Sequence, residues 1–310
     1  MIELFDKIVK EHPLKETLFI ERGGKWVSWT WQQFYNESIN FAKAVISMKI
    51  PPFKTVNILA SNCPEWLISF MGGIYACVVP VGVYITNNSE TCTYIAEHSE
   101  CGILVVDSVA QYKKYENDLA KLPDLKVVVF FCEVKNEEIA LLQTNAKNVK
   151  LIKWKDFIKL GETQKNDELL NERISMQRPG NCCDIVYTSG TTGPPKAVML
   201  SHDNFTWTGL TFYHAFKEIV GTDNRSVSFL PLSHIASQYT DIIRPMIDNN
   251  QVYFARADAL TSGSLLDTIK FVKPTGFFAV PRIYEKFEDR IRETFEKAST
   301  IKKKISKYII

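Results

Sequence analysis

Small, hydroxyl-bearing and basic residues are concentrated in one short segment, 187–196, which reads YTSGTTGPPK. Gly190 and Gly193 give the backbone access to positive φ, so that successive N–H groups can converge on an anion. Lys196 adds a positive charge that can reach a phosphate group. The hydroxyl groups that can donate further hydrogen bonds belong to Thr188, Ser189, Thr191 and Thr192. The sequence therefore predicts a phosphate-binding loop.

An exposed turn rich in Ser, Thr and Gly is the alternative interpretation of this segment. Its position after an apolar run, its adjacent prolines and its lysine favour phosphate binding instead. A Walker A motif is excluded, because Gly193 is followed by Pro194 where that motif has lysine. A dinucleotide-binding motif is also excluded, since the chain contains no G-x-G-x-x-G.

Short apolar runs that could position this loop recur along the chain. They are rich in Val, Ile, Phe and Tyr and are bounded by turn-forming residues, which is typical of buried strands. The predicted strands are 56–60, 77–84, 103–107, 127–131, 184–187, 227–230, 252–255 and 277–280.

Helical patterns lie between these runs. Thr30 and Gln33 form a capping box, followed by apolar residues at helical spacing. Further helices are predicted after Asn204, over 264–272, and after Pro281. Strands that alternate with helices indicate an α/β fold with largely parallel sheets. The polar segment 133–178 is predicted to hold a surface helix and a linker.

Composition excludes several classes of protein. Apolar residues make up 45% of the 310 residues and the net charge is +2, so neither a disordered chain nor a nucleic-acid-binding protein is expected. Seven irregularly spaced cysteines favour a reducing compartment. The N-terminus lacks the apolar stretch of a secretory signal, and no run approaches the ~18 apolar residues of a membrane-spanning helix.

These features predict an intracellular protein, either cytoplasmic or peripheral on the cytoplasmic face of a membrane. The lysines at 302–304, with Lys307, form a solvated helix face or a surface for anionic lipid. No metal-ligand set is predicted, and the oligomeric state is left open.

The order YTSGTTGPPKAVMLSHDN, at 187–204, resembles the phosphate-loop signature of the adenylate-forming superfamily of AMP-binding enzymes. This superfamily includes acyl-CoA synthetases, luciferases and the adenylation domains of peptide synthetases. Other segments resemble the same family in order: NCPEW at 62–66, CVVPVGVY at 77–84, FLPLSHIAS at 229–237 and FFAVPRIYEKF at 277–287. The combination is most similar to the long-chain fatty acyl-CoA synthetases of the bubblegum type.

The resemblance implies roles for individual residues. Residues 188–193 would hold the β- and γ-phosphates of ATP, and Lys196 would help to neutralise them. His234 would line the acyl-adenylate pocket, although a core histidine is the alternative. The acyl site would be walled by Ala279, Val280 and Pro281. The family usually has glycine where this chain has Ala197. If that glycine serves a tight backbone approach, alanine would impair the site, whereas an extended backbone would tolerate alanine.

The implied reaction joins a fatty acid to AMP and then to CoA, with ATP, Mg²⁺ and CoA taking part. The resemblance also implies a large N-terminal domain that is incomplete in residues 1–310. The family's Y-G-x-T-E segment and its small C-terminal lid domain with a catalytic lysine are not found in these residues. Residues 1–310 alone are therefore not expected to complete thioester formation.

Two other functions stay open at this point. One is a different carboxylate-adenylating enzyme, such as an aryl-CoA ligase or an amino-acid adenylation domain. The other is a non-catalytic fragment that binds a nucleotide or a partner. Adenylation assays across acid classes would separate the first, and Lys196→Ala would leave a scaffold role intact.

Overall fold

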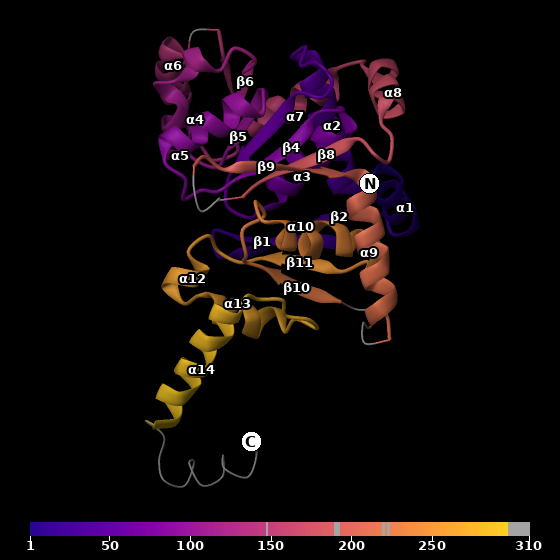
Figure 1. Ribbon diagram of the computed structural model, residues 1–310, viewed down its shortest axis with the longest axis vertical. Helices are drawn as coiled ribbons and strands as arrows, with labels where there is room; N and C mark the ends of the chain where they lie inside the picture. Colours follow the sequence, from indigo (N-terminus) through magenta and orange to yellow (C-terminus); the bar gives the residue numbers. More distant parts are fainter. Residues whose placement is uncertain (147, 189–192, 219–220, 222–223, 297–310) are drawn as a thin grey trace. The chain divides into compact units, whose positions relative to one another are not determined.

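The computed structural model describes residues 1–310 except 147, 189–192, 219–220, 222–223 and 297–310 (Figure 1). The chain divides into two compact units, Met1–Thr275 and Gly276–Ile310. The first unit contains both β-sheets and the candidate site residues Thr188, Lys196 and His234.

The larger sheet has seven strands in the order β7-β6-β5-β3-β4-β8-β9. Its strands are β3 (Thr55–Leu59), β4 (Val79–Val83), β5 (Cys101–Val106), β6 (Val127–Phe130), β7 (Lys150–Lys153), β8 (Cys182–Thr188) and β9 (Lys196–Ser201). All neighbouring pairs are parallel except β8 and β9, which are antiparallel. Every residue of β3, β4 and β5 is buried, as expected for parallel strands that are covered on both faces.

The smaller sheet has four strands in the order β10-β11-β1-β2. Its strands are β1 (Glu16–Arg22), β2 (Lys25–Thr30), β10 (Arg225–Ser228) and β11 (Gln251–Phe254). Strand β11 is parallel to both β1 and β10, whereas β1 and β2 form an antiparallel hairpin. Segments more than 200 residues apart in sequence, such as β1 and β11, are therefore neighbours in this sheet.

Helices cover both faces of the larger sheet. The α-helices are α1 (Ile2–Glu11), α2 (Trp31–Ser47), α3 (Pro64–Tyr75), α4 (Ser89–His98), α5 (Val109–Glu116), α6 (Asn136–Asn145), α7 (Trp154–Thr163), α8 (Asp167–Met176), α9 (His202–Phe216), α10 (Ile235–Gln238), α11 (Arg244–Asp248), α12 (Ala259–Ser262), α13 (Leu265–Val272) and α14 (Pro281–Glu296). A 3₁₀ turn spans Leu119–Lys121 and a π-helix spans Tyr239–Ile243.

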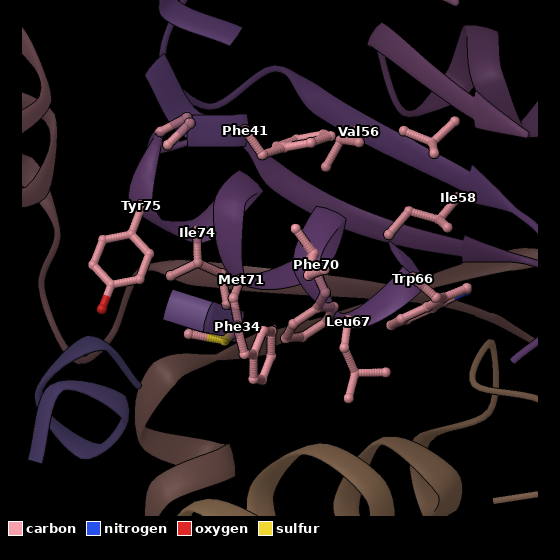
Figure 2. Packing of buried hydrophobic residues seen from close by; sticks show 14 of the residues in the cluster. Phe34, Phe41, Val56, Ile58, Trp66, Leu67, Phe70, Met71, Ile74 and Tyr75 are labelled. Carbon is pink, nitrogen blue, oxygen red and sulfur yellow. The ribbon is translucent and has the colours of Figure 1, made fainter. Parts of the chain in front are cut away.

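Alternate residues of the strands enter two different hydrophobic cores. Ile103 and Val105 of β5 pack with side chains of α2, α3 and α7, whereas Leu104 and Val106 pack with α4, α5 and α6. This alternation follows from the two-residue period of a strand. Figure 2 shows the first core, where α3 contributes Trp66, Leu67, Phe70, Met71, Ile74 and Tyr75 beside Val56 and Ile58 of β3.

Most predicted elements are confirmed. The strands predicted at 56–60, 77–84, 103–107, 127–131, 184–187, 227–230 and 252–255 correspond to β3, β4, β5, β6, β8, β10 and β11. The Thr30–Gln33 capping box is present at the start of α2. A second capping box, formed by Ser201 and Asn204, begins α9 slightly earlier than predicted.

Two predictions are wrong. The run 277–280 is not a strand, because its Phe277 ring packs on the rings of Tyr284 and Phe287 in the helix that follows. The segment 133–178 is not one surface helix and a linker. It folds into α6, β7, α7 and α8, each of which contributes apolar side chains to the two hydrophobic cores, among them Leu142, Leu151, Phe157 and Leu170.

Candidate functional site

The predicted phosphate loop joins the two antiparallel strands at the edge of the larger sheet. Thr188, the last residue of β8, lies directly opposite Lys196, the first residue of β9. Residues directly opposite each other in an antiparallel pair project from the same face, so the hydroxyl and the ammonium group share one side of the hairpin. Both side chains are exposed. Ser189, Gly190, Thr191 and Thr192 lie outside the described residues.

The conformation of the hairpin explains two of its small residues. Gly193 has φ of +90°, and no heavy atom lies within 4 Å of the position that a Cβ would occupy. A side chain there would be strained by the backbone alone. Ala197 instead has the extended conformation of β9 and pairs with Tyr187. Its backbone does not need glycine, so the alternative in which alanine is tolerated here is the one that the fold adopts.

His234 is placed at the start of a short helix. It caps α10, where its Nδ1 accepts a hydrogen bond of 3.2 Å from the backbone N–H of Ala236. A neutral imidazole that accepts at Nδ1 carries its proton on Nε2. The side chain is exposed, so the alternative of a core histidine is wrong.

Contacts from distant segments fix the turn that precedes His234. The amide of Asn62 donates to Ser228 Oγ at 2.9 Å and to Leu230 O at 2.7 Å, and its Oδ1 accepts from the N–H of Leu232 at 3.0 Å. The segment NCPEW therefore serves a structural purpose, with Trp66 fully buried. Sequence reasoning missed the role of Asn62, because no local pattern links residue 62 to residues 228–232.

A glycine at the end of β4 supports the same turn. A Cβ on Gly82 would lie 2.7 Å from Cα of Ser233 and 3.3 Å from the Trp66 ring. Only a residue without a side chain permits this approach of strand and turn. Tyr84, two residues later, shares a hydrogen bond with the Ser233 side chain, and burial raises the pKa of the phenol.

Two buried carboxyl groups lie close to these elements. Asp184 of β8 is completely buried, and this burial raises the pKa of its carboxyl well above the usual range. The side chain of Gln238, at the end of α10, is its polar neighbour. Asp241, in the π-helix Tyr239–Ile243, is also buried, which raises its pKa to about 7. Thr240 Oγ1 donates to its Oδ1 at 2.8 Å.

A cavity of about 560 Å³ opens where several parallel strands end. Ser61 and Asn62 follow β3, Asp107 follows β5, and Arg256 follows β11. The Asp107 carboxylate accepts hydrogen bonds from the backbone N–H and the hydroxyl of Ser61, at 2.8 and 3.0 Å. The carboxyl ends of parallel strands are the usual place for ligands in α/β folds.

The second unit contains the predicted acyl-site segment. Ala279 and Val280 precede α14, and Pro281 is its first residue. Val280 is 44% exposed. Tyr284 donates a hydrogen bond of 3.0 Å to the carbonyl of Phe277, which ties the segment to its own helix.

The sequence profile of AMP-binding enzymes matches residues 5–307. The chain belongs to this family. Among curated relatives, it is 37% identical over 309 residues to the long-chain-fatty-acid–CoA ligase ACSBG2 of Gallus gallus and 34% identical over 305 residues to ACSBG1 of Rattus norvegicus. These alignments cover 99% and 98% of this chain but only 39% and 41% of the relatives. The chain thus spans about two fifths of the length of the relatives that it matches.

Solved structures of other proteins have the same fold. The chain superposes with a TM-score of 0.75 on the anthranilate CoA ligase AuaEII, solved in complex with anthranoyl-AMP. The TM-score is 0.80 on the A domain of the carboxylic acid reductase from Segniliparus rugosus, solved with AMP and a co-purified carboxylic acid. Sequence identities are 20% and 15%, and the matches cover 90% and 96% of this chain but 49% and 51% of those chains.

Among the residues that the structure describes, no three or more His, Cys, Asp or Glu side chains are grouped so that they could hold a metal ion. The helices within the described ranges include none that is long and apolar enough to cross a bilayer.

Proposed function

We propose that this chain is the nucleotide-handling N-terminal part of an AMP-forming ligase that activates long-chain fatty acids to acyl-CoA. Support comes from relatives at 34–37% identity that are named long-chain-fatty-acid–CoA ligases. Their names favour a fatty acid over the aryl and amino acids that other adenylate-forming enzymes use. Residues 1–310 would be one portion of a larger catalytic domain.

The observation that carries the proposal is the geometry of the β8–β9 hairpin. Thr188 and Lys196 are paired on one face at the end of the hairpin that adjoins its loop, and the positive φ of Gly193 lets the chain turn between them. A hydroxyl donor and an ammonium group on one face suit the phosphates of a nucleotide. Both side chains are exposed and can reach a ligand without rearrangement of the core.

The proposed reaction has two steps. A carboxylate oxygen attacks the α-phosphorus of MgATP, the bond from that phosphorus to the bridging oxygen breaks, and pyrophosphate leaves. The sulfur of CoA then attacks the acyl carbon, AMP leaves, and the thiol proton passes to solvent. Lys196 and the hydroxyl of Thr188 would stabilise charge on the departing phosphates in the first step.

His234 would take a positioning role beside the acyl-adenylate. Its exposed imidazole is held by the backbone of Ala236 through Nδ1, which leaves the Nε2–H as the donor available to a substrate. For Ala279, Val280 and Pro281, the acyl-site role remains a prediction from the resemblance.

Lys196→Ala tests the proposal directly. We expect the unmodified chain to bind MgATP and the variant to bind it at least tenfold more weakly, because a charge-assisted hydrogen bond contributes roughly 1.5–3 kcal/mol. The measurement is isothermal titration calorimetry, and melting temperatures would show that both proteins are folded.

Lys155→Ala is the matched control. Lys155 is an exposed lysine of α7, 84% accessible and paired with Glu133. Its removal should leave MgATP affinity unchanged. Equal affinity of the Lys196→Ala variant and the unmodified chain would contradict the assignment of the hairpin. A folded chain that binds no MgATP would favour the non-catalytic alternative.

A further inference from the structure

Helix α4 contacts the β8–β9 hairpin near the loop that joins its two strands. Two of its residues, Tyr94 and His98, are one helical turn apart and therefore share a face of the helix. The hydroxyl of Tyr94 donates to the carbonyl of Pro195 at 3.3 Å. Nδ1 of His98 is 2.7 Å from the hydroxyl of Tyr187.

These two contacts reach both sides of the hairpin. Tyr187 immediately precedes Thr188 on β8, and Pro195 immediately precedes Lys196 on β9. One face of α4 thus contacts the residue before each of the two paired candidate ligands. Since Thr188 and Lys196 are cross-strand partners, a contact that fixes either flank restrains the pair.

The three rings add packing to these hydrogen bonds. Tyr94 stacks on His98 with ring centroids 5.3 Å apart, and the Tyr187 ring meets both rings edge to face at 6.5 and 5.8 Å. Stacked and edge-to-face ring contacts of this kind hold the helix and the hairpin together in addition to the hydrogen bonds. Burial also raises the pKa of the Tyr187 phenol to about 12, so its hydroxyl remains protonated and able to donate at neutral pH.

We propose that Tyr94 and His98 form a brace that holds the β8–β9 hairpin in its nucleotide-binding conformation. This inference rests on the proposed function of the hairpin, and it assigns a positioning role to a helix that contributes no phosphate ligand itself. Fixing a backbone in one conformation costs conformational entropy. Contacts that hold Tyr187 and Pro195 in place before the nucleotide arrives remove part of that cost from the binding step.

Tyr94→Phe is the most conservative test, because it keeps the ring and removes only the hydroxyl that Pro195 accepts from. We expect faster amide hydrogen exchange in the ligand-free β8–β9 hairpin, and MgATP affinity about threefold to tenfold weaker, as loss of one neutral hydrogen bond implies. His98→Phe keeps the stacked ring, removes the contact to the Tyr187 hydroxyl, and should act in the same direction.

Tyr112→Phe is the matched control. Tyr112 belongs to the same hydrophobic core as Tyr187, yet its buried hydroxyl has no hydrogen-bond partner among the described residues. Removing this hydroxyl should change neither hairpin exchange nor MgATP affinity. A loss that the control shares would mean that the core, and not the brace, sets the affinity, and would overturn the inference.

The remaining outcomes separate the brace from the function on which it rests. Unchanged hairpin exchange in Tyr94→Phe, or faster exchange with unchanged MgATP affinity, would overturn the brace while the unmodified chain still binds nucleotide. If the unmodified chain binds no MgATP, the proposed function fails and the nucleotide role of the brace fails with it. Hydrogen exchange in the variants would then still report whether α4 restrains the hairpin.

Discussion

Asp184 departs from the solvent-exposed position that is typical of an aspartate. The carboxyl of an aspartate is expected to contact water or a cation. Asp184, on strand β8 of the larger sheet, is instead fully buried. Neither carboxyl oxygen has a hydrogen-bond partner of normal geometry among the described residues, although Gln238 is close. Such a group is held in its neutral form, since burial of an unpaired charge is far more costly.

This burial predicts a dependence of stability on pH. The folded state keeps the proton of Asp184, because its pKa is raised, whereas the unfolded state loses it above about pH 4. The free energy of unfolding should therefore fall as pH rises from about 4 toward the folded pKa, by about 1.4 kcal/mol for each pH unit from this group. Asp184→Asn cannot titrate and should be more stable than the unmodified chain at pH 8.

Urea unfolding at pH 5 and pH 8 would measure the effect. Asp289→Asn, an exposed aspartate of α14, is the control and should leave the difference between the two pH values unchanged. If Asp184→Asn is destabilised at pH 8, then the buried carboxyl is ionised or makes a bond that asparagine cannot replace, and the argument fails.

At the scale of elements, the decisive feature is the packing of strand ends against distant turns. The carboxyl end of β4 lies against the turn before His234, and Gly82 is the point of closest approach. Asn62, after β3, holds the same turn through three hydrogen bonds. Two parallel strands of the larger sheet thus position a segment that follows the smaller sheet's strand β10.

Gly82→Ala tests this packing. The new methyl group would lie 2.7 Å from the backbone of Ser233, so the turn must move or the strand must shift. We expect a loss of about 1–3 kcal/mol in the free energy of unfolding, the usual cost of an overpacked contact. Chemical denaturation would measure this loss.

Gly180→Ala is the control for this substitution. No atom lies within 4 Å of the position of its Cβ, and its φ is not positive. It should change stability little. Equal stability of the Gly82→Ala variant and the unmodified chain would show that the strand and the turn are not in close contact.

At the scale of the whole molecule, the chain has the fold of the AMP-binding family over about two fifths of the length of its relatives. The hairpin, the His234 turn and the cavity at the strand ends all lie within Met1–Thr275. By resemblance, the glutamate of the family's Y-G-x-T-E segment and the lysine of its C-terminal lid domain would take part in the complete reaction. None of the family segments that carry them is found in residues 1–310.

We therefore predict that purified residues 1–310 bind MgATP but form no acyl-CoA. The assay would follow a radiolabelled long-chain fatty acid in the presence of MgATP and CoA. A complete long-chain-fatty-acid–CoA ligase, assayed in parallel, is the positive control. A robust yield of acyl-CoA from residues 1–310 would show that these residues contain a sufficient catalytic set.

Features that depend on neighbouring residues could be predicted from the amino-acid sequence alone. The glycine-rich phosphate loop, the alternating strands and helices, and the capping box at Thr30 are local patterns, because φ preferences, side-chain period and caps act over a few residues. The apolar run 277–280 shows the limit of such patterns. Its composition fits a strand, but the ring of Phe277 packs on Tyr284 and Phe287 of the helix that follows.

Contacts between residues that are distant in sequence could not be predicted and follow from the folded structure. The order of the strands brings α4 into contact with the β8–β9 hairpin. It also brings Asn62 next to residues 228–232 and Asp184 next to Gln238. Periodicity reports that a strand is buried, but it does not report which strand or turn will be its neighbour. The neighbours of a strand depend on how whole faces of sheets and helices pack. The Tyr94–His98 brace, the contact of Gly82 with Ser233 and the burial of Asp184 could therefore be identified only in the folded chain.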